Sequence, residues 1–301
     1  MTIVLFVHGI NNQNNSKENI EQTWSEAIKS SADRLGLSIP ADVRFKAAFY
    51  GDVLFRETES WDENKDTATP MSVNSPAEDY ADGEVAALYR EFQREYDIKD
   101  EEVKKELEPE DDLRAQTQAD GIHKRWLKAI ARILERILPP ANEDKIVRSF
   151  LTQAAAYLHK PGLKETIDDI VKEQIFDDLS PNEEVVIISH SLGTVVMYAL
   201  LRRLRHKVKA KLLVTAGSPL GVETVKRRLG MPLACLPNVK KWYNIADNED
   251  FVALQSKLDK VTFGCDKIEN ISDLDNGEED AHSILMYLSH DRVVKNILAH
   301  L

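Results

Sequence analysis

Short apolar runs recur along the chain and predict buried strands. The strand candidates are residues 3–7, 43–50, 185–189, 212–216 and 239–245, and most of them are continuous rather than alternating in hydrophobicity. Continuous runs are typical of parallel strands that are covered on both faces. Helical patterns separate the runs, at residues 17–35, 147–178, 193–205 and 222–229. The alternation of strands and helices predicts an α/β fold built on an open, mostly parallel sheet.

One long segment, residues 51–140, interrupts this alternation. It begins with a polar, acidic stretch, "ESWDENKDTATPMSVNSPAEDYADGE", which we interpret as a loop. Two helical patterns follow, at residues 84–107 and 113–138. The pair Pro139-Pro140 would end the second one. We expect a single domain over residues 1–301, with an acidic helical cap inserted at residues 53–140, ahead of the third apolar run.

The charge of the chain is concentrated in this insertion. The net charge is -12, and residues 57–112 hold 20 acidic and 6 basic side chains. The remainder is nearly balanced, so no basic face is expected and a nucleic-acid-binding role is disfavoured.

The second cap pattern, "GIHKRWLKAIARILERILPP", is amphipathic and basic. Its apolar positions recur at steps of three or four, at Ile122, Trp126, Ile130, Ile133 and Ile137. Such a helix can contact an anionic membrane surface. The commoner use of an apolar stripe is packing against the rest of the domain. Both interpretations are open at this point.

The termini and cysteines indicate a cytoplasmic protein. The apolar run in "MTIVLFVHGI" is short and has no basic stretch before it, so it resembles a strand more than a signal peptide. No run is long enough to cross a bilayer. Cys235 and Cys265 are too few for a disulfide framework. One incidental pair is conceivable, but reduced thiols are the simpler expectation.

The stretch "VVIISHSLGTVVMYALL" has the features of a nucleophile elbow. Such an elbow needs a buried strand, a serine on a sharp turn, small residues two positions to either side, and a helix directly afterwards. Here Ser191 is the serine, Gly193 is one small residue, and Ser189 stands where glycine is commoner. The helix that follows directs its first amides toward the turn. The alternative is an ordinary strand–helix turn or a small phosphate-binding loop.

A second stretch, "IVLFVHGINNQ", ends a strand in His8-Gly9 before a polar loop. Acyl transfer needs two backbone N–H groups to hold the oxygen of the tetrahedral intermediate. We expect one from Leu192, next to the nucleophile, and one from Ile10, because Gly9 lets this loop approach closely. His8 itself is expected to be a structural hydrogen-bonding residue rather than a base.

A carboxylate and a base follow later in the chain. The stretch "WYNIADNEDFVAL" places Asp247, Glu249 and Asp250 after a strand. We favour Asp250 as the group that orients a catalytic imidazole, with Asp247 second. Alternatively, all three are solvated turn residues, with Asp247 capping the turn locally. His282, in "EEDAHSILMYLSHDRVV", is the expected base, at the entrance to a helix.

The other histidines are expected to serve packing or the surface. His290 competes with His282 but falls within a helical pattern, and His190 is expected to pack beside the nucleophile. The order serine, acid, histidine along the chain is that of the α/β-hydrolase version of the triad.

The chain resembles α/β-hydrolases of the lipase and esterase kind. The matching stretches are "FVHGI", "SHSLG", "AGSPLG", "WYNIADNEDFVA" and "AHS", in the family's order. The resemblance implies that Ser191 is the nucleophile, His282 the base and Asp250 the acid, that the substrate is a small-molecule or lipid ester, and that no cofactor is needed. No cluster of His, Cys and carboxylates has the spacing of metal ligands. "AGSPLG" is similar to a loop of lipase-like members, without a role for Ser218.

The chain departs from the family pattern in three ways. Ser189 replaces the first elbow glycine, the two leading strands of the full fold are absent, and the cap precedes the nucleophile strand. A lipase, phospholipase, esterase and thioesterase are therefore not separated. The second class of function is a non-catalytic protein of this fold that binds protein partners through the acidic insertion.

Overall fold

A six-stranded sheet forms the centre of the molecule. The computed structural model describes residues 2–58, 83–107, 124–138, 146–180, 183–277 and 281–301. The strands are β1 (Thr2–Val7), β2 (Val43–Ala48), β3 (Glu184–His190), β4 (Lys209–Ala216), β5 (Val239–Asp247) and β6 (Ile268–Leu274). All neighbours pair in parallel, in the order β2-β1-β3-β4-β5-β6. The expected α/β class with a parallel sheet is confirmed.

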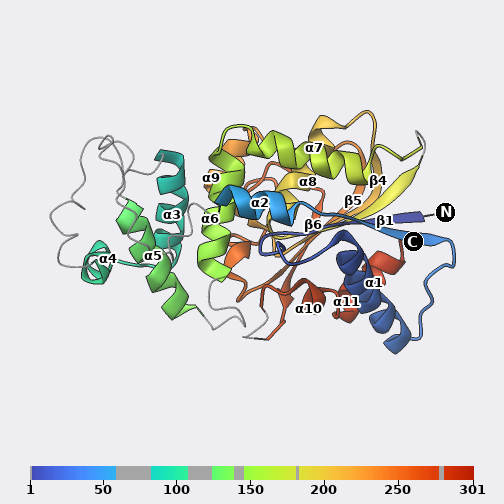
Figure 1. Ribbon diagram of the computed structural model, residues 1–301. Coiled ribbons are helices and arrows are strands. Elements are labelled where there is room, and N and C mark those ends of the chain that lie inside the picture. Colours follow the sequence, from blue (N-terminus) through green and yellow to red (C-terminus); the bar gives the residue numbers. More distant parts are fainter. Residues whose placement is uncertain (1, 59–82, 108–123, 139–145, 181–182, 278–280) are drawn as a thin grey trace.

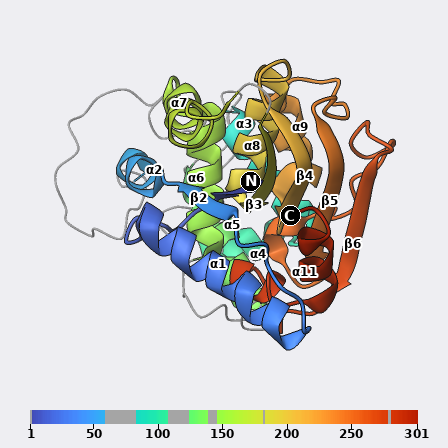
Figure 2. The same ribbon diagram turned by 90° about the vertical axis from the view of Figure 1, so that its right-hand side faces the viewer.

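Helices cover both faces of this sheet (Figure 2). On one face lie α1 (Lys17–Arg34), α10 (Ile284–Tyr287) and α11 (Asp291–Leu298). On the other lie α6 (Ile146–His159), α7 (Leu163–Ile175), α8 (Leu192–Arg203) and α9 (Glu223–Leu229). The central strands are therefore buried on both sides, which explains why their sequences are apolar without alternation.

Several helical patterns are broken where the sequence suggested continuity. The pattern at 147–178 forms α6 and α7, because Pro161 and Gly162 intervene and Gly162 has a φ of 79°. The pattern at 84–107 forms α3 (Gly83–Glu95) and α4 (Asp100–Glu106), with Asp97 between them at a φ of 51°. A positive φ cannot continue a right-handed helix.

The remaining differences between the predicted and the observed elements lie in the insertion and at the edge of the sheet. Residues 51–58 form a helix, α2 (Gly51–Thr58), before the acidic stretch, of which residues 59–82 lie outside the described residues and the last two begin α3. The helix α5 (Lys124–Ile137) occupies the later part of the pattern at 113–138, whose beginning is also outside them. The strand β6 was not predicted, because "IENISDL" at the sheet edge has no continuous apolar run.

The insertion packs against the domain through apolar side chains. Figure 1 shows α3, α4 and α5 beyond α6 and α9, at the end of the molecule opposite the chain termini. The apolar face of α5 is buried in the main core, through Trp126, Leu127, Ile130, Ile133 and Leu134. Packing against the domain therefore accounts for this stripe. Ile137, at the end of the helix, is half exposed.

A buried carboxylate joins the insertion to the domain. Glu91, on α3, accepts hydrogen bonds from the backbone N–H groups of Glu223 and Thr224, at 2.5 and 3.0 Å, and from the Thr224 hydroxyl at 2.9 Å. These amides belong to the first turn of α9, which has no side-chain cap of its own. Glu91 therefore supplies the acceptor that the start of this helix needs.

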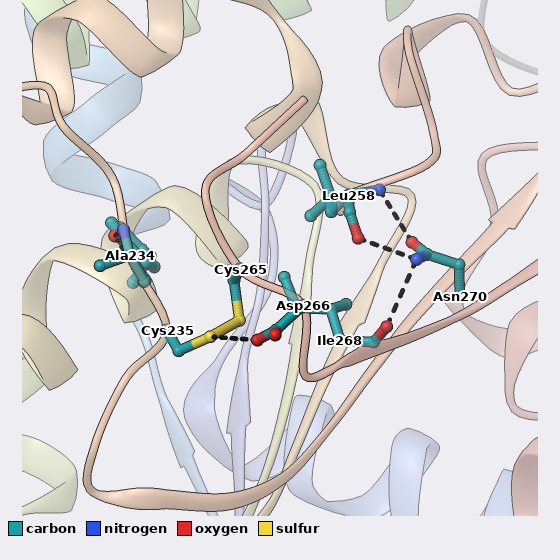
Figure 3. Close-up of a disulfide and its surroundings, with 8 residues drawn as sticks. Ala234, Cys235, Leu258, Cys265, Asp266, Ile268 and Asn270 are labelled. Carbon is teal, nitrogen blue, oxygen red and sulfur yellow. Dashed lines mark hydrogen bonds between the residues drawn. A yellow bond between two sulfur atoms is a disulfide. The ribbon is translucent and has the colours of Figure 1, made fainter. Parts of the chain in front are cut away.

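The two cysteines form a disulfide, so the expectation of reduced thiols is wrong. Cys235 and Cys265 have Cα atoms 4.8 Å apart, and they precede β5 and β6 respectively (Figure 3). The bond therefore joins the segments that enter two neighbouring strands at their amino ends.

None of the described helices combines the length and hydropathy required to span a membrane.

The end of β1 and the start of α8 are in direct backbone contact. A Cβ atom added to Gly193 would lie 2.3 Å from the carbonyl oxygen of His8 and 2.5 Å from that of Val7. Real Cβ atoms do not approach a backbone oxygen so closely, so position 193 requires glycine.

We expect Gly193→Ala to lower the free energy of unfolding by about 1–3 kcal/mol, because the added methyl group forces β1 and α8 apart. Gly83→Ala is the matched control, since a Cβ there meets nothing within 4 Å. Thermal and denaturant unfolding measure both variants. Equal stability of the two would contradict this account.

Candidate active site

Ser191 occupies a strained turn between β3 and α8. Its φ of 54° and ψ of -131° lie outside the regions that non-glycine residues usually adopt. Such strain persists only where the surroundings enforce it, and it is frequent at functional sites. The backbone N–H of Ser191 donates to the carbonyl of Ala216 at 3.0 Å, which attaches the turn to the end of β4. The Ser191 hydroxyl is buried and has no hydrogen-bond partner among the described residues.

The small neighbours of Ser191 make the turn sterically feasible. A Cβ on Gly9 would lie 2.4 Å from the Ser191 Cβ and 2.9 Å from its Oγ, so the loop after β1 rests directly on the serine. Ser189, where glycine was expected, donates its hydroxyl proton to the carbonyl of Val214 at 3.0 Å. Its polar atom is therefore satisfied inside the sheet, and serine is tolerated at this position.

His282 and Asp250 form a buried pair. The Nδ1 atom of His282 lies 2.8 Å from each carboxylate oxygen of Asp250. A carboxylate only accepts hydrogen bonds, so Nδ1 carries the proton and Nε2 of a neutral ring is left as an acceptor. Nε2 is buried and has no partner among the described residues. This tautomer is the one that a general base requires.

Asp250 is itself held by two other groups. Its Oδ1 accepts the backbone N–H of Val252 at 2.9 Å, and its Oδ2 accepts the Tyr287 hydroxyl at 2.7 Å. The Tyr287 oxygen also accepts the backbone N–H of Asp247 at 2.9 Å. Burial, followed by the charge of Asp250, raises the pKa of Tyr287 well above its usual value. Tyr287 thus remains a hydrogen-bond donor to the carboxylate.

The other proposed acid has a different environment. The Asp247 carboxylate accepts the backbone N–H groups of Glu249 at 2.7 Å and Asn276 at 2.5 Å. It organises the turn after β5 and the segment after β6 and makes no contact with His282. The geometry therefore favours Asp250 over Asp247 as the partner of the histidine.

The serine and the acid–base pair meet at the end of β4. Ala216 accepts the Ser191 amide, and the next residue, Gly217, lies against the pair. A Cβ on Gly217 would lie 2.6 Å from Asp250 Oδ2 and 3.0 Å from His282 Nδ1. Ser191 Oγ and His282 Nε2 are nevertheless not hydrogen-bonded to each other. The structure brings the three residues to one place and leaves the contact between hydroxyl and imidazole open.

The two proposed oxyanion donors belong to adjoining turns. Ile10 follows Gly9, and Leu192 follows Ser191, so both amides flank the contact between these two turns. Neither N–H donates to another group in the described part of the chain. Free amides beside a buried serine are what an oxyanion hole requires.

His8 determines how the Ile10 amide points. The His8 Nε2 atom accepts the backbone N–H of Tyr50 at 3.1 Å, so Nδ1 carries the proton and donates to the Gly9 carbonyl at 2.7 Å. In a planar trans peptide, C=O and N–H point in opposite directions. The Gly9 carbonyl faces His8, and the Ile10 N–H is therefore directed away from that ring. Burial lowers the pKa of His8 to about 4, which keeps this ring neutral.

Two residues differ from what the sequence indicated. His290 is not within a helix: it caps the start of α11, and its Nε2 lies 2.8 Å from Asn276 Oδ1. Tyr287 was not singled out, although it holds both Asp250 and the end of β5. Nothing local marks it, because "SILMYLS" resembles an ordinary apolar helix turn.

Comparisons with family models and with curated proteins identify no relative of this chain. No model of a known protein family matches the chain, and no curated protein matches it. The fold class rests on the sheet, and any function must be argued from the geometry of Ser191, His282 and Asp250.

The buried, neutral state of His8 predicts how the free energy of unfolding depends on pH. The unfolded chain binds a proton at His8 near its usual pKa of about 6.5, and the folded chain does so only near 4. Stability is therefore lost as the pH falls through this window, by about 3 kcal/mol from this residue. We expect His8→Gln to reduce the loss of stability between pH 6.5 and 4. His206→Gln is the control, because His206 is exposed. The free energy of unfolding is measured by denaturant at each pH. If it depends on pH in His8→Gln as it does in the wild type, the assignment of a buried, neutral His8 is wrong.

Proposed function

We propose that the protein is a serine hydrolase that cleaves carboxylic esters through an acyl-enzyme intermediate. Ser191 is the nucleophile, His282 the general base and Asp250 the acid that orients it. The observation that carries the proposal is the Asp250–His282 pair, which leaves an unprotonated Nε2 beside the strained turn of a buried, unpartnered serine. An isolated strained serine would support no particular reaction.

The residues suggest a definite sequence of proton transfers. His282 Nε2 removes the Ser191 proton as Oγ attacks the ester carbonyl carbon, and the carbonyl oxygen becomes an oxyanion near the Ile10 and Leu192 amides. The imidazolium, stabilised by Asp250, then protonates the departing alkoxide, so that the alcohol leaves and the acyl group stays on Ser191. Water attacks this ester with the same base and releases the acid.

The missing contact between Ser191 and His282 is compatible with this scheme. Catalytic hydrogen bonds are frequently long in free enzymes and shorten only with substrate. The Ser191 hydroxyl can rotate about χ1, and no other group among the described residues competes for it. In the proposed mechanism, rotation of the Ser191 side chain would bring the hydroxyl to His282 Nε2 when substrate binds.

The parallel sheet and the order of its strands are compatible with an α/β-hydrolase type of fold, which is the fold we propose. In an open parallel sheet, sites form beyond the carboxyl ends of strands, where the order of connections reverses. Here β1 lies between β2 and β3. The turn with Ile10 follows β1, and the turn with Leu192 follows β3. The acid and the base follow β5 and β6. All five proposed residues thus follow the carboxyl ends of strands, on the same side of the sheet.

The surroundings of His282 favour an apolar acyl group. The ring of Phe251 lies 6.0 Å from that of His282, and Phe150 and then Phe92 follow at 5.9 Å each. This series leads from the base through α6 to α3 in the insertion. These rings are buried and give the base an apolar environment on this side. An ester with a hydrocarbon acyl chain is therefore the proposed substrate, with thioesters and phospholipids as alternatives on the same triad.

The direct test is covalent labelling by a fluorophosphonate, which reacts with activated serines. We expect the wild-type protein to be labelled and Ser191→Ala to be unlabelled. Ser189→Ala is the matched control, because that serine is buried two residues away and its hydroxyl serves the sheet. Labelling that persists in Ser191→Ala would reject the proposal, and mass spectrometry of the labelled peptide locates the adduct.

A second test separates the two carboxylates. We expect Asp250→Asn to reduce kcat on a p-nitrophenyl ester by about 10³–10⁴-fold, because an amide stabilises the wrong tautomer of His282. Asp247→Asn should reduce kcat far less, since that carboxylate accepts only backbone N–H groups in the structure. The reverse ranking would reassign the acid.

A further inference from the structure

His190 is directly attached to the residue proposed as the base. It precedes Ser191 at the end of β3, and its Nε2 lies 2.8 Å from the backbone carbonyl of His282. A carbonyl only accepts, so His190 Nε2 carries a proton and donates it. The two imidazole rings also pack together, with centroids 4.5 Å apart and planes inclined by 36°.

No other hydrogen bond joins the elbow to the base-bearing segment among the described residues. The Ser191 hydroxyl does not reach His282, and the His282 side chain is otherwise bonded only to Asp250. Asp250 follows β5, which is joined to β3 only through β4, so that contact fixes the base relative to β3 indirectly. His190 is on β3 and adds a direct hydrogen bond between the nucleophile strand and the residue of the base.

The two contacts act on different parts of His282. The hydrogen bond holds its main chain, and the ring contact limits rotation of its side chain. Trp24 closes the other side, its ring standing nearly edge-on to His190 at a centroid distance of 6.5 Å. Burial, followed by the adjacent His282, lowers the pKa of His190 well below its usual value. A neutral ring can pack beside the imidazolium that forms during turnover without repelling it.

We propose that His190 is a positioning residue, which holds His282 at the distance and angle from Ser191 that proton transfer needs. This inference rests on the hydrolase function proposed above. It assigns His190 no proton transfer of its own: the residue acts through His282. Misplacement of a catalytic group by about 1 Å can reduce a rate by about 10²-fold.

The experiment compares two substitutions at this position. His190→Phe keeps an aromatic ring against His282 and removes the N–H donor, whereas His190→Gln places an amide N–H close to the position of Nε2. We expect His190→Phe to reduce kcat on a p-nitrophenyl ester and the fluorophosphonate labelling rate by about 10- to 100-fold, with KM nearly unchanged. His190→Gln should recover most of the loss. Melting temperatures of both variants identify any loss of folded protein.

A double-mutant cycle separates positioning from a general structural effect. If His190 acts through His282, His190→Phe should change the labelling rate less than twofold in a His282→Ala background. The same reduction in both backgrounds, or no reduction in either, would overturn the inference while Ser191-dependent labelling still supported the hydrolase. Wild-type protein that is not labelled at Ser191 would overturn both.

Discussion

Close backbone contact at the carboxyl edge of the sheet is the constraint on which the proposed site depends. Gly9 touches Ser191, Gly193 touches the end of β1, and Gly217 touches the Asp250–His282 pair. At each of these three positions, an added Cβ atom would come too close to its neighbours, so only glycine fits. Three turns from distant parts of the chain can therefore lie side by side at the carboxyl ends of the strands. The strained backbone of Ser191 is a consequence of the same crowding.

The electrostatic arrangement follows from burial in this crowded place. Buried polar groups need partners, and nearly every polar group around the site has one: the Asp250 carboxylate accepts four close contacts from three residues. Two buried side-chain atoms in the described site lack a partner, Ser191 Oγ and His282 Nε2. An unpaired buried polar atom costs stability, so its persistence is informative. In the proposed mechanism, these are the two atoms between which a proton moves.

Much of the fold was predictable, because it is encoded locally. Short apolar runs, most of them continuous, identified five of the six strands, and the turn after β3 was recognisable from its spacing of small residues. The edge strand β6 was missed because it is covered less completely and needs fewer apolar residues. The breaks at Gly162 and Asp97 were missed because apolar periodicity continues across both. The disulfide depends on the approach of two loops, which composition does not reveal.

The candidate site was predictable to the same local extent. Chain order and turn chemistry indicated Ser191, Asp250 and His282; the structure places Asp250 and His282 against Gly217, and the preceding Ala216 accepts the Ser191 amide. The supporting contacts of His190 and Tyr287 were not predictable, since each depends on how α10 lies against the sheet. Sequence patterns report which face of an element is buried. They do not report which polar atom on another element it meets.

The Glu91 contact has a consequence for the independence of the insertion. The first turn of α9 takes its acceptor from a side chain 132 positions earlier in the chain, on an element that is outside the sheet fold. The insertion is thus not a detachable module: exchanging it for a segment from another protein would leave the α9 amides unsatisfied. Evolutionary change in the two segments should consequently be correlated.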